Sequence, residues 1–224
     1  MDIGSVFKKT YQYEESIKIQ KMAVKNAFAL NTPDSFIGSL YNNQAEVHYA
    51  MEEYDSAKFY FHKALEYWGD DDIRRFTSGI NIRLAQIKIA EKNYNESIID
   101  LNSCLDFFEN TQKDTLEIIF VLKEFLVPLK QLNKIDELIT YVDSIDSYMI
   151  NYQLGNKSQM RIYWSMFKAL RNIKNDEANQ YKSLAIENMN TYLETFKKVK
   201  DKENIKLNSK IVKEIIGYQN AILN

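Results

Sequence analysis

The side chains that most often carry enzyme chemistry are scarce in this sequence. His48 and His62 are its histidines, and Cys104 is its single cysteine. Neither histidine belongs to an HExxH motif or to a Cys/His cluster with the spacing of a metal site. We expect His48 to be a buried imidazole with its hydrogen bonds satisfied, and His62 to be exposed on the opposite helix face from Phe61. Cys104 should fill a small buried site, because a reactive thiol needs exposure and an electropositive setting.

Other chemistry-bearing patterns are equally weak. Asp70, Asp71 and Asp72 follow one another, but three consecutive carboxylates in a linker do not converge on one ion, and a solvated turn before the next helix fits them better. The six glycines are scattered singly, so no phosphate-binding loop is expected. No Ser/His/Asp constellation is apparent. The sequence therefore predicts no catalytic residue, no metal site, no cofactor and no enzymatic activity.

Composition favours a helical protein. Over 224 residues there are only 6 glycines and 2 prolines, so both helix breakers are avoided. A formal net charge of −2 gives no global field that favours nucleic acid or an anionic membrane. No run of about 18 apolar residues predicts a membrane span, and the N-terminus lacks an apolar signal core. With one cysteine, a reducing compartment and a cytoplasmic location are expected.

A repeat with a period of about 40 residues underlies the sequence, within the range of helical solenoids. Tyr13, Tyr54 and Tyr94 recur at almost equal intervals. After each tyrosine comes a small residue three positions on and a second one seven further. These small residues are Ser16 and Ala23, Ala57 and Ala64, and Ser97 and Cys104. A fourth copy has larger apolar residues at the same places: Ile135, Leu138, Val142 and Ile145.

Each repeat predicts two antiparallel helices, with the tyrosine at the turn between them. Another apolar-periodic stretch precedes each tyrosine, such as SLYNNQAEVHYAM before Tyr54. Small residues on the second helix allow it to approach its neighbours, since large side chains would hold the helix axes beyond about 8–10 Å. We therefore expect Ala57, Ala64 and Cys104 to be buried between helices.

These residues resemble the tetratricopeptide repeat (TPR). In the second repeat the motif positions fall on Tyr41, Ala45, His48, Tyr54, Ala57, Phe61 and Ala64. In the third they fall on Leu84, Ala85, Tyr94, Ser97, Leu101 and Cys104, and in the first on Gly4, Phe7, Tyr13, Ser16 and Ala23. The period is longer than that of the motif and the closing proline is absent, so helices or connecting turns should be extended. Such a long period is similar to variants in bacterial peptide-sensing regulators and in repeat regions attached to sensor kinases.

The resemblance implies an all-α fold, a right-handed superhelical solenoid of about five antiparallel helix hairpins plus a C-terminal helix. We expect one domain over 1–224, with repeats over 1–30, 36–68, 77–109, 115–150 and 157–200 and a helix over 206–224. The second helix of the fifth repeat should be longer than the others, and residues 200–210 should form a turn or frayed segment. The last helix is either a cap or a dimerisation or signalling helix. Repeat one begins partway into its first helix, which indicates either a fragment of a longer chain or a shortened capping helix.

The resemblance also implies a concave groove lined by the first helix of every repeat. The family's groove positions fall on Asn42, Asn43, Glu46, Tyr49, Ile82, Arg83, Gln86, Ile89, Lys123, Val127 and Lys130. Asn43, Arg83 and Lys123 are equally spaced at one repeat period, which predicts a row of polar side chains along the groove. Ser5 and Gly79 occupy other positions of the family's carboxylate clamp, so a complete clamp is not expected. The alternative is that these polar residues only keep the face soluble.

Two functions follow from this interpretation. The first is a non-catalytic scaffold that binds a peptide or a partner helix in the groove. The second is a peptide-sensing regulatory domain, or a repeat region of a larger bacterial signalling protein. Partners should be proteins or peptides and not nucleic acid, and a homodimer through the C-terminal helix is an alternative use of that helix. Arg83→Ala and Lys123→Ala are expected to weaken a ligand and to leave thermal stability nearly unchanged.

Overall fold

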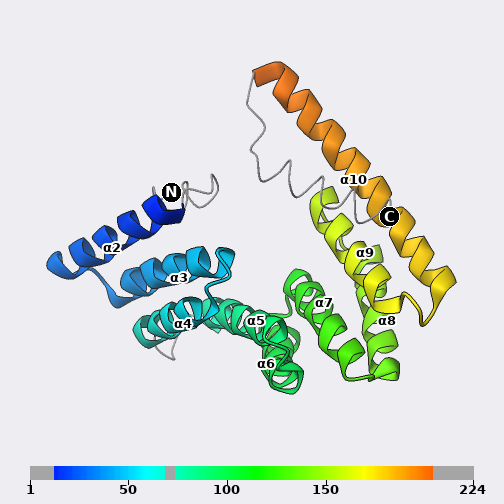
Figure 1. The fold of residues 1–224 in the computed structure, drawn as a ribbon, viewed down its shortest axis with the longest axis horizontal. Coiled ribbons are helices and arrows are strands. Elements are labelled where there is room, and N and C mark those ends of the chain that lie inside the picture. The colour runs from blue at the N-terminus through cyan, green and yellow to red at the C-terminus, as the bar shows by residue number, and fades with distance from the viewer. Residues whose placement is uncertain (1–12, 69–73, 204–224) are drawn as a thin grey trace. The chain divides into compact units, whose positions relative to one another are not determined.

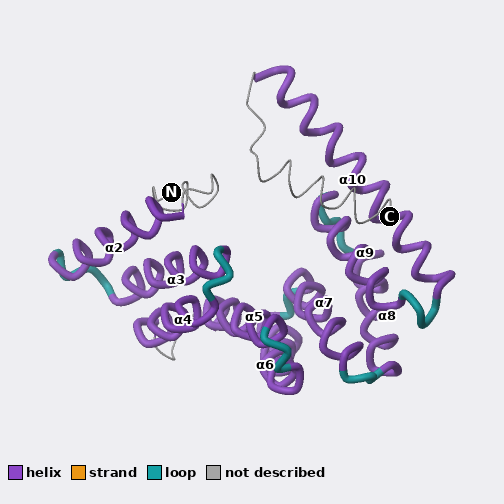
Figure 2. The backbone as a smooth tube through the Cα atoms, in the orientation of Figure 1, coloured by secondary structure: helices purple, strands orange, loops and turns teal. Residues whose placement is uncertain are grey.

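The computed structural model describes residues 13–68 and 74–203, and every regular element in these ranges is a helix (Figures 1 and 2). The prediction of an all-α repeat fold is confirmed. The expected helix over 206–224 lies outside the described residues, as do Gly4, Ser5, Phe7 and Asp70–Asp72.

The helices follow one another as first and second members of hairpins. They are α2 (Tyr13–Ala29), α3 (Asp34–Ala50), α4 (Tyr54–Trp68), α5 (Arg74–Ala90), α6 (Tyr94–Asp106), α7 (Thr115–Gln131), α8 (Ile135–Asn151), α9 (Asn156–Leu170) and α10 (Asn175–Glu203). A short π-helix, η1 (Phe107–Gln112), continues α6. The long second helix of the last hairpin is confirmed, because α10 has 29 residues. It runs through residues 200–203, so the predicted turn does not begin there.

The repeat period is visible in the helix boundaries. The predicted turn positions Tyr54, Tyr94 and Ile135 are the first residues of α4, α6 and α8, and Tyr13 lies at the first described residue of α2. The first helices α3, α5 and α7 end at residues 50, 90 and 131, so the second interval is longer by a single residue than the first. These three helices have 17 residues each. The turns after them are short, so within these hairpins the helices and not the turns are extended.

The turns within the hairpins share one backbone conformation. Glu52, Lys92 and Asn133 are left-handed, with φ of 61°, 66° and 57°. In each turn the next residue's N–H donates to the carbonyl oxygen five residues back: Glu53 to His48 at 3.0 Å, Asn93 to Lys88 at 2.8 Å and Lys134 to Leu129 at 2.9 Å. This pattern closes a helix with a Schellman motif. The same closure therefore reverses the chain at three successive repeats.

Contacts between residues divide the chain into two compact units, Met1–Ile87 and Lys88–Asn224. In the first unit α3 packs against both α2 and α4. In the second unit α7 contacts α6, α8 and α9, and α9 packs against α10. The expected single domain over 1–224 stays a prediction.

The core of the first unit is built around small residues, as the repeat predicts. Ala57, Phe61 and Ala64 on α4 are completely buried (0%), and they cluster with residues of α3 and α5. The other members of this cluster are Ala45, Trp68, Ile80 and Ile87. The prediction that Ala57 and Ala64 lie between helices is confirmed.

The second unit keeps the same pattern with larger side chains. Leu101 and Cys104 on α6 are buried, and so are Leu138, Val142 and Ile145 on α8. The larger residues of the fourth repeat therefore occupy the same buried stripe that small residues occupy in α4 and α6. A side-chain cap begins α7, where the Asp114 carboxylate accepts hydrogen bonds from the N–H groups of Leu116 and Glu117 at 3.1 and 3.3 Å.

Alanine substitutions at two glycines of the first helices should have opposite effects on the free energy of unfolding. A Cβ at Gly38 would lie 2.5 Å from Cδ1 of Trp68, whose indole N–H donates to the Ser35 carbonyl oxygen. Overpacking of this kind costs about 1–3 kcal/mol, so Gly38→Ala should lower the free energy of unfolding. At Gly79 a Cβ would meet nothing within 4 Å, so Gly79→Ala should raise it by about 0.5–1 kcal/mol through helix propensity. Urea denaturation of the two variants tests this, and a stabilised Gly38→Ala would contradict the packing argument.

Candidate functional site

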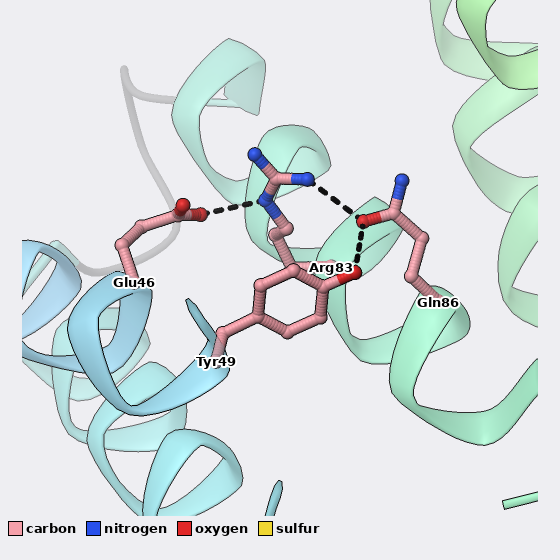
Figure 3. A network of polar contacts seen from close by, with 4 residues as sticks. All are labelled: Glu46, Tyr49, Arg83 and Gln86. Carbon is pink, nitrogen blue, oxygen red and sulfur yellow. Dashed lines mark hydrogen bonds and ion pairs between the residues drawn. The ribbon is translucent and has the colours of Figure 1, made fainter. Parts of the chain in front are cut away.

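Within the first unit, α3 and the part of α5 up to Ile87 are joined by a network of four polar side chains (Figure 3). Glu46 and Tyr49 come from α3, and Arg83 and Gln86 come from α5. In each helix the two residues are three positions apart, which places them on one face. All four are predicted groove residues, and the structure brings them together.

Arg83 is the centre of the network. Its Nε donates to Oε1 of Glu46 at 2.6 Å, and one terminal nitrogen donates to Oε1 of Gln86 at 2.8 Å. The guanidinium carbon also lies 5.2 Å from the centroid of the Tyr49 ring, within the range of a cation–π contact. The Tyr49 hydroxyl donates to the same Gln86 oxygen at 3.2 Å.

This arrangement fixes the orientation of the Gln86 amide. Its oxygen accepts from both Arg83 and Tyr49, so the amide nitrogen points away from them, as Figure 3 shows. An amide nitrogen carries two donors. The network therefore presents oriented N–H groups that a carbonyl oxygen of a peptide could accept.

The same contacts change the expected effect of Arg83→Ala on stability. The Arg83 side chain is 38% exposed, but that of Glu46 is only 17% exposed. Removing the guanidinium leaves a largely buried carboxylate without this donor, which should cost about 1–2 kcal/mol. Arg161→Ala, at an exposed position of α9, should change stability by less than about 0.5 kcal/mol. Urea denaturation of both variants checks this, and equal losses would show that the network contributes nothing.

Lys123 and Lys130 have partners of their own in the second unit. Lys123 forms an ion pair with its neighbour Glu124 at 2.6 Å. The Lys130 ammonium donates to the carbonyl oxygens of Lys168 and Arg171 at 2.6 and 2.9 Å. It therefore caps the C-terminal end of α9, where a cation is favourable.

Lys123 does not have the same position within its repeat as Arg83. Asn43 and Arg83 each lie seven residues before the last residue of α3 and α5, whereas the residue seven before the end of α7 is Glu124. The turns agree, because the interval from Lys92 to Asn133 is also longer by a single residue than the interval from Glu52 to Lys92. One residue turns a helix by about 100°, so Lys123 has a different helical position from Arg83.

The remaining predicted groove residues lie on the same first helices. Asn42, Asn43, Ile82 and Ile89 are partly exposed, and Val127 on α7 is 47% exposed. Gly79, a predicted clamp position, is exposed. Whether these residues contact a partner stays a prediction.

Sequence reasoning missed two cations on the equivalent face of α9. Lys168 and Arg171 stand one repeat after Val127 and Lys130, at the interval that separates the starts of α7 and α9, so the repeat register could have found them. Desolvation lowers the pKa of the Lys168 ammonium, and nearby Lys123 lowers it further. Burial and nearby Arg171 likewise lower the pKa of Lys130. The nearby Glu124 carboxylate has the opposite, smaller effect and raises the pKa of Lys168.

His48 combines a satisfied nitrogen with an unsatisfied one. The residue is 9% exposed and stacks on Tyr60 with ring centroids 5.2 Å apart. Its Nδ1 lies 2.6 Å from the Glu53 carboxylate, but Nε2 has no hydrogen-bond partner among the described residues. The prediction of a buried imidazole is confirmed, and the prediction that both nitrogens are satisfied is wrong. His62 is exposed, as predicted.

Cys104 should be inert in the folded protein. Its side chain is 1% exposed, and burial, with a smaller effect of Asp100, raises the pKa of the thiol to about 12. At about pH 8 the thiol is therefore protonated, and the thiolate is the reactive form. Labelling with a chromogenic disulfide reagent should be very slow in buffer and fast in concentrated urea. Rapid labelling of the native protein would contradict the assignment of Cys104 as a packing residue.

Neither a metal site nor a membrane-spanning helix is found in the described part of the chain. No group of three or more His, Cys, Asp or Glu residues there could hold a metal ion. No helix within 13–68 or 74–203 combines the length and the apolar character needed to cross a membrane.

Comparisons with known proteins bear on the fold. No protein-family model and no curated protein matches the chain. The crystal structure of YrrB, a TPR protein with an unusual peptide-binding site, is similar with a TM-score of 0.50 and 14% identity, over 83% of this chain and 82% of that one. Kinesin light chain TPR-like repeats from Podosopora anserina are similar with a TM-score of 0.64 and 10% identity, over 85% and 93% of the two chains.

A second structure of the Podosopora anserina repeats, which carries one substitution, gives a TM-score of 0.67 at 10% identity, over 86% of this chain and 93% of that one. At identities this low, the three matches show that the folds are alike and nothing more. The same likeness follows from the tyrosines that begin the second helices and from the buried small residues of α4 and α6. The chain is a TPR-type helical repeat protein in its fold.

Proposed function

We propose that the chain is a non-catalytic interaction scaffold that binds an extended peptide or a partner helix along the face of its first helices. The observation that carries the proposal is the network of Glu46, Tyr49, Arg83 and Gln86. It holds polar groups in fixed positions on α3 and α5 while they remain partly exposed. Groups fixed before binding lose less conformational entropy when a partner arrives.

The network favours recognition of a peptide main chain over recognition of an acidic side chain in the first unit. Arg83 already neutralises Glu46, so its guanidinium is not an unpaired cation. The Gln86 amide nitrogen points away from Arg83 and Tyr49 and can donate to a main-chain carbonyl. In this proposal Asn42 and Asn43 on α3 would supply further amide contacts, since an asparagine amide both donates and accepts.

The second unit carries positive charge of its own that would attract acidic residues. Lys123, Lys130 and Lys168 lie on α7 and α9, which pack together. Glu124 pairs with Lys123, so the cluster keeps an excess of positive charge. Positive charge of this kind accelerates association with an acidic partner, and the effect weakens at high salt.

The relative with a named peptide site supports the same class of function. YrrB is a TPR protein with a peptide-binding site, and its likeness to this chain extends over most of both. A cytoplasmic, non-enzymatic protein with protein or peptide partners is consistent with this proposal.

Panning a displayed random-peptide library on the purified chain, followed by fluorescence anisotropy of a selected peptide, tests the proposal. Gln86→Leu removes the amide donors and should weaken binding about fivefold or more. Tyr49→Phe removes the hydrogen bond that orients Gln86 and should weaken it less. His62→Ala, at an exposed position of the second helix α4, should leave affinity unchanged. Selected peptides that bind all three variants as tightly as the wild type would place the site elsewhere.

The alternative is that peptide binding alters the solenoid and serves a regulatory output, as in a sensor. Small-angle scattering of the chain with and without a selected peptide separates the two functions. A change in radius of gyration on binding would favour the sensor, and an unchanged profile would favour the scaffold.

A further inference from the structure

A cavity of about 230 Å³ lies among α2, α3 and α4 of the first unit. It is lined by two lysines, three aromatic rings, an amide and a valine: Lys21, Val24, Tyr41, Gln44, Phe59, Tyr60 and Lys63. Its two residues from α3, Tyr41 and Gln44, lie on a different stripe of the helix from Glu46 and Tyr49, roughly a third of a turn away. The cavity is therefore distinct from the proposed peptide-binding face.

Gln44 supplies an unmet hydrogen-bond donor at this cavity. The residue is 1% exposed, and its amide nitrogen has no hydrogen-bond partner among the described residues. Buried polar groups are nearly always paired, and a donor left without an acceptor destabilises the protein. The nitrogen itself is buried, so the Gln44 side chain must turn toward the cavity before a ligand oxygen can supply the missing acceptor, which a purely apolar ligand cannot supply.

The charges around the cavity favour an anion. Lys63 pairs with Glu66 at 2.7 Å and its side chain is 36% exposed. Lys21 is exposed, and it forms no ion pair within the described ranges. The lining thus holds two ammonium groups, of which one is neutralised by an adjacent carboxylate. One positive charge remains for a ligand.

The walls favour a flat or apolar body. The Tyr41 and Tyr60 rings are stacked with centroids 6.3 Å apart, and Phe59 meets Tyr60 edge to face at 5.0 Å. Phe59 is 56% exposed, so it offers apolar surface that a ligand could cover. The volume is smaller than the roughly 300–1,000 Å³ of sites for drug-sized ligands, which limits the body to about one ring or a short chain.

We propose that this cavity binds a small organic monocarboxylate with an aromatic or short aliphatic body. Its carboxylate is held by Lys21 and accepts from the Gln44 amide, and its body packs on Tyr60 and Phe59. The site is independent of the peptide-binding face, so ligand binding here does not require a peptide. The chain would then have two separate binding sites, this cavity for a small molecule and the face of α3 and α5 for a peptide.

Titration of the full chain with phenylacetate and with its neutral analogue phenylacetamide tests the proposal, with isothermal calorimetry and amide chemical shifts as readouts. Phenylacetate should bind saturably, with a dissociation constant of about 1 mM or tighter. Phenylacetamide should bind at least about fivefold more weakly, because it lacks the charge that Lys21 attracts.

Variants locate the binding site. Lys21→Met, at an exposed position that does not risk the fold, should weaken phenylacetate about fivefold and leave phenylacetamide unaffected. Gln44→Leu should weaken both ligands, and Lys25→Met, one turn further along α2 at an exposed position, should weaken neither. Equal affinity for the acid and the amide, no saturable binding, or full affinity in Lys21→Met would each overturn the proposal.

The peptide-binding variants keep the two proposals apart. Gln86→Leu should bind phenylacetate as the wild type does, and Lys21→Met should bind a selected peptide as the wild type does. Loss of both ligands in one variant would contradict the independence of the two sites.

Discussion

Phe61→Ala should lower the free energy of unfolding by about 3–5 kcal/mol, the usual cost of removing a buried phenylalanine. Phe61 is completely buried (0%) and belongs to the cluster that joins α3, α4 and α5. Alanine would remove the ring and leave a cavity in contact with three helices. Since small domains are stable by only about 5–15 kcal/mol, this one substitution should remove a large share of the stability of the first unit.

Phe59→Ala is the matched control for this prediction. Phe59 lies two residues earlier on the same helix, with the same side chain, but it is 56% exposed. Its loss should change the unfolding free energy by less than about 0.5 kcal/mol. Urea denaturation followed by circular dichroism gives both values. Similar losses in the two variants would mean that Phe61 does not hold the helices together.

The architecture was predictable because tight packing constrains residue size. Ala57 and Ala64 recur at a spacing of two helical turns because α4 approaches its neighbours closely there, and both are buried. Tyr54 and Tyr94 marked the starts of α4 and α6. Both signals are local, so a single sequence is enough to read them.

The details of the turns could not be read in the same way. Glu52 and Lys92 are left-handed, a conformation usually taken by glycine or asparagine. Their own identities gave no hint of it, because the surrounding Schellman hydrogen bonds impose the conformation. Asn133 was a usable signal, but a single asparagine is too common to fix a helix end.

The sequence indicated which residues lie on the first-helix face, but not which of them pair with one another. Glu46, Tyr49, Arg83 and Gln86 were all assigned to the first-helix face. The sequence did not reveal that Arg83 pairs with Glu46 across repeats, because that depends on how two helices approach. Whether Lys123 contacts a partner stays a prediction, but an assumed constant period ignores the one extra residue between the turns at Lys92 and Asn133.

Ala64→Leu should lower the free energy of unfolding by about 1–3 kcal/mol, because added methyl groups force a packed core apart. Ala64 is completely buried (0%) in the same cluster as Phe61, and alanine and leucine are both good helix formers. Ala90→Leu, at an exposed position near the end of α5, should have almost no effect. An Ala64→Leu protein as stable as the wild type would show that α4 is not closely approached at this position.

Combining the two core substitutions gives the sharper test. Phe61 and Ala64 are three residues apart on one face of α4, so the leucine of Ala64→Leu can occupy part of the space vacated in Phe61→Ala. Cores tolerate substitutions that conserve total volume. The double variant should therefore be more stable than the sum of the single losses predicts, by at least about 1 kcal/mol. Strict additivity would mean that the two side chains do not share one space, and the small residues of the repeat would then need another explanation.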